Sequence, residues 1–356
     1  MRTSTTIRGF LILALLVMAP GVGWAQNQIL QTAGVDDAEV AADYYNTIDP
    51  GHQRMTQADW EEVNGFNSAV NTVVDVRGYY NAGDLNFWRS IQMVRDKRPG
   101  YRRNIAFTTV NYLTEADSLS GDNPASIVNM EYSRGPEGDR LVKFYIYDEV
   151  TGERKLSTNF SPFDSRSQEL FVPAACYSCH GGDDDDSSPV GPDGYNEGSG
   201  ETNAGFMAFD VSTMEFDVTT LASLEAGIRK LNKAVLRTDP SKATRKLIKG
   251  LYGGKRLPNA TQDLDYIPAS WDDDGDNEYL YREVIVPTCR ICHTNSDTKL
   301  LRLSWWEANP KKIREAVFHE LLMPNSIPNF DRFWDSSSTP RQYEVLFDAL
   351  DRFENP

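Results

Sequence analysis

The stretch Ala175 to Gly182 reads ACYSCHGG, in which two cysteines stand three positions apart and a histidine directly follows the second. The same pattern returns as CRICH, Cys289 to His293. The two motifs use all four cysteines of the 356-residue chain and two of its four histidines. The fold must leave room for the group that these cysteines and histidines bind. The two motifs therefore limit which folds the chain can adopt.

A Cys-x-x-Cys-His motif is typical of a c-type haem attachment site, where each thiol adds to a haem vinyl group and the adjacent histidine ligates the iron. We therefore predict two covalently bound haems c as cofactors. The predicted attachment residues are Cys176, Cys179 and His180 in the first motif and Cys289, Cys292 and His293 in the second.

Two other kinds of site use paired cysteines. A zinc site could gather both pairs into one tetrahedral cage, but it leaves both following histidines unexplained. A thioredoxin-like redox pair needs a βαβ context and no trailing histidine. Haem attachment explains every residue of the repeated pattern.

The N-terminus predicts export. Arg2 and Arg8 precede the apolar run Phe10 to Met18, and small residues lead to a cleavage point after Ala25. We expect residues 1–25 to be a signal peptide and the mature chain to be periplasmic. The apolar run is too short to span a bilayer comfortably, so we expect no membrane span in the mature chain. An uncleaved anchor is the alternative.

The chain is acidic, with 52 Asp and Glu against 36 Lys and Arg and a net charge of −16. Such a charge disfavours binding to nucleic acid or to anionic membranes. It either favours basic docking partners or simply keeps the chain soluble. We expect redox partner proteins, basic ones on this reasoning, and no nucleic acid.

Composition divides the exported chain into three parts: an α+β domain at 26–165, a first haem region at 166–257 and a second haem region at 258–356. The first haem region contains a Gly- and Asp-rich loop at 181–205, whose run Asp183 to Asp186 we take as solvated. Periodicity predicts helices at 38–45, 57–74 and 219–236, and strands at 104–113, 126–132 and 140–147.

The segment Asp272 to Glu283 fits the register of a calcium-binding loop. Position six, normally glycine, is Asn277, which tolerates the left-handed backbone needed there. An acidic helix N-terminus without any metal is the alternative. The predicted calcium ligands are Asp272, Asp274, Asp276, Glu278 through its carbonyl, and Glu283.

Residues 258–356 resemble a small class I cytochrome c domain. Such domains place a helix directly before the haem motif, a methionine followed by proline in a distal loop, and a closing helix that packs across the first. The matching segments are Glu278 to Val286, Met323-Pro324 and Tyr343 to Phe353. The resemblance implies that His293 and Met323 are the axial ligands of the second haem.

The spacing departs from that family, because only thirty residues separate His293 from Met323. On a helix from Ala308 to Leu322, His319 would lie about one turn before Met323, so His319 is the alternative ligand. A histidine there would lower the potential of the iron, because methionine ligation raises it.

The first motif has no Met-Pro pair after it. Met207 is the predicted sixth ligand, with an open or histidine-bound iron as the alternatives. Other side chains that could reach the iron are Met214, His52, Met93 and Met130.

The predicted fold class is α+β, with an N-terminal mixed α/β region followed by mainly α-helical cytochrome c-like haem domains. Two haems in one exported chain predict a dihaem c-type cytochrome that carries electrons between redox partners. The alternatives are a dihaem peroxidase-like enzyme or another haem oxidoreductase, and a haem-bearing subunit of a respiratory complex.

Overall fold

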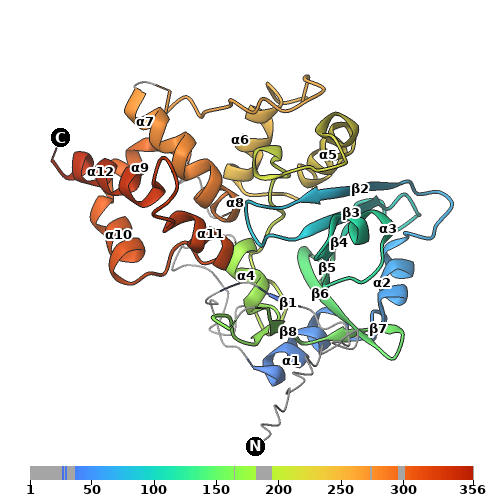
Figure 1. Cartoon of the computed structure of the whole chain (residues 1–356). Coiled ribbons are helices and arrows are strands. Elements are labelled where there is room, and N and C mark those ends of the chain that lie inside the picture. Colours follow the sequence, from blue (N-terminus) through green and yellow to red (C-terminus); the bar gives the residue numbers. More distant parts are fainter. Residues whose placement is uncertain are drawn as a thin grey trace, which may run out of the picture.

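The computed structural model describes residues 26–27, 29, 37–163, 165–181, 195–272, 275–295 and 301–355 (Figure 1). The expected signal peptide, Asp183 to Asp186 of the acidic loop and Asp274 of the expected calcium loop lie outside the described residues.

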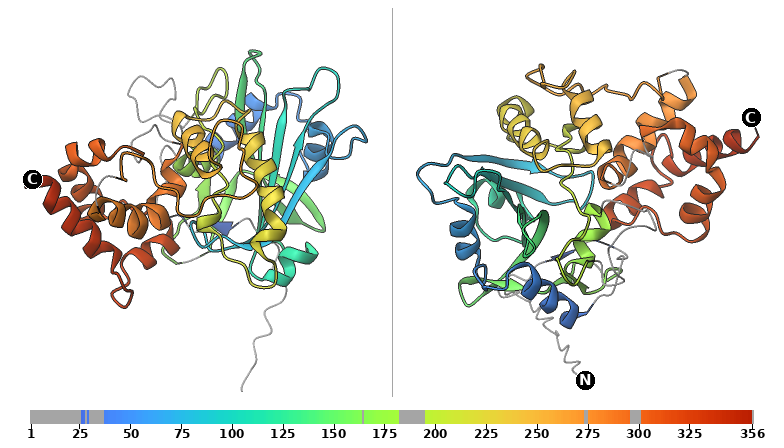
Figure 2. Two further views of the ribbon diagram at one scale, coloured as in Figure 1. Left: turned by 90° about the horizontal axis from the view of Figure 1, so that it is seen from above. Right: turned by 180° about the vertical axis from the view of Figure 1, so that it is seen from behind.

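A six-stranded antiparallel sheet occupies the middle of the fold, with helices around it (Figures 1 and 2). Each strand pairs with the one that follows it in the chain. The strands are β2 (Val73–Tyr80), β3 (Trp88–Arg95), β4 (Ile105–Tyr112), β5 (Ser126–Arg134), β6 (Arg140–Val150) and β7 (Glu153–Ser157). The strands expected at 104–113, 126–132 and 140–147 are confirmed as β4, β5 and β6.

The helix expected at 57–74 is wrong in its second half. Helix α2 (Gln57–Asn64) starts at a capping box between Thr56 and Asp59, and it ends where Gly65 takes a left-handed conformation with φ of 79°. The residues from Val73 onward are β-branched and aromatic, and they pair with β3 instead.

One face of the sheet is covered by α2 through buried polar side chains. Arg54 makes two contacts of 3.0 Å with the carboxylate of Glu131 on β5. Asn64 of α2 donates to the same carboxylate at 2.7 Å, and Lys143 of β6 lies 3.8 Å away. Helix α1 (Ala38–Ile48) packs beside this cluster, and its Tyr44 hydroxyl accepts from the Phe144 amide at 3.1 Å.

This cluster makes the stability depend on pH. Burial would raise the pKa of Glu131, but the positive charges of Arg54 and Lys143 outweigh it and lower the pKa from 4.5 to about 2. A carboxyl group whose pKa falls on folding stabilises the folded state above its unfolded pKa. We expect about 3 kcal/mol of the unfolding free energy to be lost as the pH falls from 4.5 towards 2.

Denaturant titrations at several pH values measure this loss. Glu131→Gln should remove most of the pH dependence in that range, whereas Glu149→Gln, at an exposed position of β6, should leave it in place. Equal pH profiles for Glu131→Gln and the unchanged protein would contradict the assignment.

The other face of the sheet packs against the segment with the first motif. The motif ends helix α4 (Ala174–His180), and a small sheet of β1 (Gln26–Asn27), β8 (Asn159–Pro162) and β9 (Leu170–Phe171) lies beside it. The helix expected at 219–236 is confirmed as α5 (Leu221–Val235), and α6 (Lys242–Leu251) follows. Sheet, α4, α5 and α6 share one hydrophobic core.

Residues 265–355 add a helical region with its own core around Trp271, Tyr281 and Trp306. The leading and closing helices expected at 278–286 and 343–353 are confirmed and contact each other. Short helices fill the space between them. The elements are α7 (Gly275–Leu280), a π-helical segment Tyr281–Cys289, α8 (Arg290–His293), α9 (Leu303–Ala308), α10 (Pro310–Arg314), a π-helical turn Glu315–His319, α11 (Ile327–Phe333) and α12 (Gln342–Glu354).

The expectation of mainly α-helical haem domains after the N-terminal region is wrong. The fold is α+β around a central antiparallel sheet, and the first motif belongs to the core of that sheet. The aromatic residues that follow the motif pack on a strand: the Phe206 ring lies 4.8 Å from that of Phe107 on β4. Such partners are distant in sequence, so local periodicity could not reveal them.

Candidate functional site

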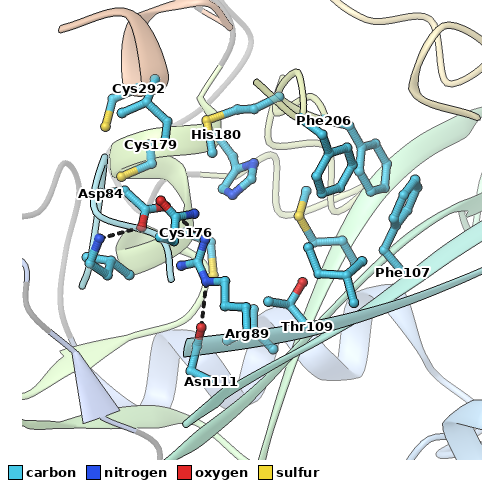
Figure 3. Close-up of a pocket in the computed structure, with 18 of the residues that line it drawn as sticks. Asp84, Arg89, Phe107, Thr109, Asn111, Cys176, Cys179, His180, Phe206 and Cys292 are labelled. Carbon is cyan, nitrogen blue, oxygen red and sulfur yellow. Dashed lines mark hydrogen bonds and ion pairs between the residues drawn. The ribbon is translucent and has the colours of Figure 1, made fainter. Parts of the chain in front are cut away.

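The two Cys-x-x-Cys-His motifs meet at the centre of the molecule, where α4 contacts α8. Cys179 and Cys292 line the same two cavities, and the neighbouring Cys179 thiol together with burial raises the pKa of Cys292 well above its ordinary value. Figure 3 shows these two side chains next to each other. All four cysteines are free thiols. The chain therefore joins two motifs that are more than a hundred residues apart in sequence.

A cavity lies between the first motif and the sheet (Figure 3). Cys176, Cys179 and His180 line it on the side of α4. Strand alternation brings every second side chain of the sheet to the opposite wall. The registered pairs form a polar row of Arg89, Asn111 and Ser126, a mixed row of Ile91, Thr109 and Val128, and an apolar row of Phe107, Met130 and Phe144.

His180 is prepared to act as a metal ligand. Its Nδ1 lies 3.1 Å from the Gly205 carbonyl oxygen, which can only accept, so Nδ1 carries the proton. Burial lowers the pKa of His180, which keeps the ring neutral. Nε2 of this neutral tautomer has a free lone pair, and a carbonyl partner on the other nitrogen is the usual arrangement for ligating histidines.

The same cavity is lined by the predicted sixth ligand of the first haem, Met207. Met130 and Met214 line it as well. Of the remaining candidates, His52 is exposed, and Met93 is buried in the core away from the cavity lining. Three methionines therefore line the same cavity as His180, and each offers a thioether sulfur as a ligand atom.

A second cavity opens beside the second motif. It is lined by Cys289, Cys292 and His293, and by the predicted ligand Met323 with Pro324. The alternative ligand His319 is exposed at the end of its π-helical turn and does not line this cavity. Other lining residues are Val317, Phe333 and Leu346 from the helical core and Ile29, Cys179 and Ser326, which also line the first cavity.

The surroundings of the two motifs fit covalently attached haem better than they fit a zinc site or a thioredoxin-like redox pair. Burial raises the pKa of Cys289 to about 12 and raises that of Cys176 further, so neither is a reactive thiolate of the kind that disulfide exchange needs. Within the described residues, no group of three or more His, Cys, Asp or Glu side chains could hold a metal ion. Each motif instead opens into a cavity lined mostly by apolar side chains, as a porphyrin requires.

Two hydrogen bonds from Asn295 tie the motifs together. Asn295 follows the second motif closely, is 1% exposed, and donates to the carbonyl oxygens of His180 and Gly205, the latter at 3.1 Å. A side chain at position 205 has no room, since an added Cβ would lie 2.5 Å from Asn295 Oδ1. The carbonyl that orients His180 is therefore shared with a residue of the other motif.

With the predicted haem attached at the first motif, Asn295→Ala should lower its midpoint potential. Without Asn295, the Gly205 carbonyl accepts only from His180 Nδ1, which makes the imidazole more basic and favours ferric iron. One hydrogen bond is worth about 0.5–1.5 kcal/mol, which corresponds to roughly 20–60 mV for one electron. A spectroscopic redox titration measures both haems, and the second serves as the internal control. An unchanged first potential would contradict this role.

Several residues that shape the site were missed by the sequence reasoning. Arg290, inside the second motif, is buried and lies 2.6 Å from the Asp210 carboxylate. Arg89 of the polar row lies 3.0 Å from Asp84 and donates to Asn111 at 2.7 Å. The charged residue between the two cysteines of the motif was the available signal for Arg290. Arg89 had none, because its neighbours come from other strands.

Two carboxylates of the expected calcium loop pair with arginines. Asp276 lies 3.0 Å from Arg352, and Glu278 lies 2.9 Å from Arg282. Helix α7 already begins at Gly275. Asp274 lies outside the described residues, so calcium binding stays a prediction.

No helix within the described residues is long and apolar enough to cross a bilayer. No protein-family model matches the chain, and comparisons with curated proteins and with solved structures give no significant match.

Proposed function

We propose that this chain is an exported dihaem c-type cytochrome that carries electrons between redox partners. The observation that carries the proposal is the contact between the two Cys-x-x-Cys-His motifs, each of which opens into its own cavity. In each cavity the motif histidine shares the lining with a methionine, Met207 or Met323. Two histidine and methionine ligand sets suit irons that keep their ligands while they change oxidation state.

The side chains have separate tasks in this proposal. The four thiols hold the two groups, and His180 and His293 ligate and orient them. The apolar walls exclude water, which favours the ferrous form and raises the potential. When bound, each haem supplies an iron that accepts and releases one electron. Cys179 and Cys292 lie next to each other, so haems held by the two motifs would be attached side by side, an arrangement that would suit direct electron exchange between them.

A haem oxidoreductase is the second candidate function. Its support is the polar row in the first cavity, where Arg89 and Asn111 lie on the wall opposite the motif. Catalysis at an iron needs an open coordination position and nearby hydrogen-bond donors. The three methionines that line the same cavity favour a closed iron and therefore electron transfer.

Spectroscopy of the purified, matured protein separates the two candidates. An electron carrier should show two six-coordinate, low-spin haems, reversible uptake of two electrons and no turnover of hydrogen peroxide after reduction. A high-spin fraction that binds cyanide, together with peroxide turnover, would replace the carrier with an enzyme.

A further inference from the structure

The positive charges of this acidic chain are concentrated in two segments. Arg95 to Arg103 and Arg229 to Arg256 together carry 15 of the 36 Lys and Arg residues, with Asp96 and Asp239 as their only carboxylates. The rest of the chain is correspondingly more negative than the net charge of −16 indicates. We call these two segments the basic face.

The two segments adjoin in space. Helix α5 contacts the edge strand β2, and α6 lies next to α5 (Figures 1 and 2). Burial and then the positive charge of Arg237 lower the pKa of Arg95 at the end of β3. Burial, Arg229 and Arg237 lower that of Lys233 in the same way. The cations of the two segments therefore act on one another electrostatically.

Neutralising partners are scarce on this face. In the part of the chain that the structure describes, Arg98 is its one cation with an ion pair, at 2.6 Å from Asp96. Lys230, Arg237, Lys242, Lys246, Lys255 and Arg256 are exposed. Charges that repel each other and lack partners raise the free energy of the isolated protein, and an acidic surface would relieve that repulsion.

A groove on the basic face lies close to the second motif. It is lined by Lys246, Lys249 and Lys255, with Arg302 and Tyr266 on its other side. The first turn of α6 reaches the motif directly, since Ser241 and Thr244 donate to the Thr294 carbonyl at 2.8 and 3.0 Å. Thr294 follows His293. A partner seated in the groove would therefore lie near the second haem site.

We infer that the basic face is the docking surface for an acidic redox protein that exchanges electrons at the second motif. This inference rests on the proposed function. A compact protein with a local acidic patch meets only the basic face, because charges farther than about 8 Å away are largely screened at physiological salt. An anionic bilayer or a nucleic acid is larger than the basic face, so the negatively charged rest of the protein surface would repel it. A protein partner is therefore the favoured occupant.

Charge reversal on the holoprotein tests the docking surface. The probe is flavodoxin in its hydroquinone form, a small acidic flavoprotein that donates single electrons. The variant Lys246→Glu/Lys255→Glu reverses two exposed cations of the groove. The matched control Lys311→Glu/Lys312→Glu reverses two exposed cations of α10 and changes the net charge equally.

The rate constant for reduction of the unchanged protein should fall as ionic strength rises, although both proteins are acidic. At low salt the groove variant should react at least about tenfold more slowly, and the control should change less than twofold. Rates that rise with salt, or that fall equally in both variants, would overturn the inference. Co-sedimentation of the unchanged protein with phosphatidylglycerol vesicles, lost in the groove variant, would overturn it in favour of a lipid surface.

Failure of the proposed function gives a different result. A chain that matures without haem shows no reducible pigment, whatever its response to salt. Calorimetric titration of the full chain with flavodoxin still measures the docking in that case, and it should show the same difference between the groove variant and the control.

Discussion

Replacing Arg290 with methionine is expected to lower the free energy of unfolding by about 3–5 kcal/mol. Arg290 is 1% exposed, and its guanidinium lies 2.6 Å from the Asp210 carboxylate. The same Nη2 donates to the Ser212 hydroxyl at 2.7 Å. Without Arg290, Asp210 would be a buried charge with no cation, which is far less favourable than a buried pair.

Removing both charges provides the control. Arg290→Met/Asp210→Leu should recover a large part of the lost stability, because no unpaired charge remains. Guanidinium titrations of the holoproteins give the three free energies. A loss below about 1 kcal/mol in Arg290→Met would show that the pair does not hold the second motif to the segment at 210–212.

Replacing Cys176 and Cys179 with alanine should leave a single attached haem and change the circular dichroism of the Soret band. Two haems attached at neighbouring thiols couple through their transition dipoles, and this coupling falls with the cube of their separation. The unchanged protein should therefore give a couplet with one positive and one negative lobe. The variant should lose the couplet and about half of the Soret absorbance.

The mirror variant, Cys289→Ala/Cys292→Ala, is the matched control and should lose the couplet in the same way. Together the two variants test proximity independently of function. A couplet that persists in either single-haem variant, or its absence from the protein with both haems, would contradict the contact between the motifs.

Haem attachment could be proposed from the sequence because the attachment residues of each motif lie close together in the chain, and it stays a prediction. Two thiols and a histidine within five positions need no tertiary information to be recognised. The same holds for α2, whose capping box at Thr56 and Asp59 is local. The C-terminus of α2 at Gly65 was missed because the helical periodicity of the sequence continues beyond this residue. The left-handed conformation of Gly65 ends the helix there.

The environment of the motifs could not be predicted in this way. Asp210 and Arg290 are eighty positions apart, and the row of Arg89, Asn111 and Ser126 exists only because three strands align in register. The expected helical domain around the first motif failed for the same reason. Apolar residues next to a haem motif can pack on a sheet as well as on helices, and only the pairing of distant strands decides between them.

The expectation of basic partners rests on the net charge alone and stays a prediction. A value of −16 predicts basic partners if the charge is spread evenly over the surface. The fold instead brings Arg95 within the electrostatic reach of Arg237, and α6 carries further lysines. The local surface, rather than the sum over the chain, governs contact at physiological salt.

The central claim is that both Cys-x-x-Cys-His motifs carry covalently attached haem, and the intact mass of the chain matured in a host with haem-attachment machinery tests it most directly. The account predicts the mass of the mature polypeptide plus two haems, retained after denaturation because the links are thioethers. The mass of the unmodified polypeptide would contradict it.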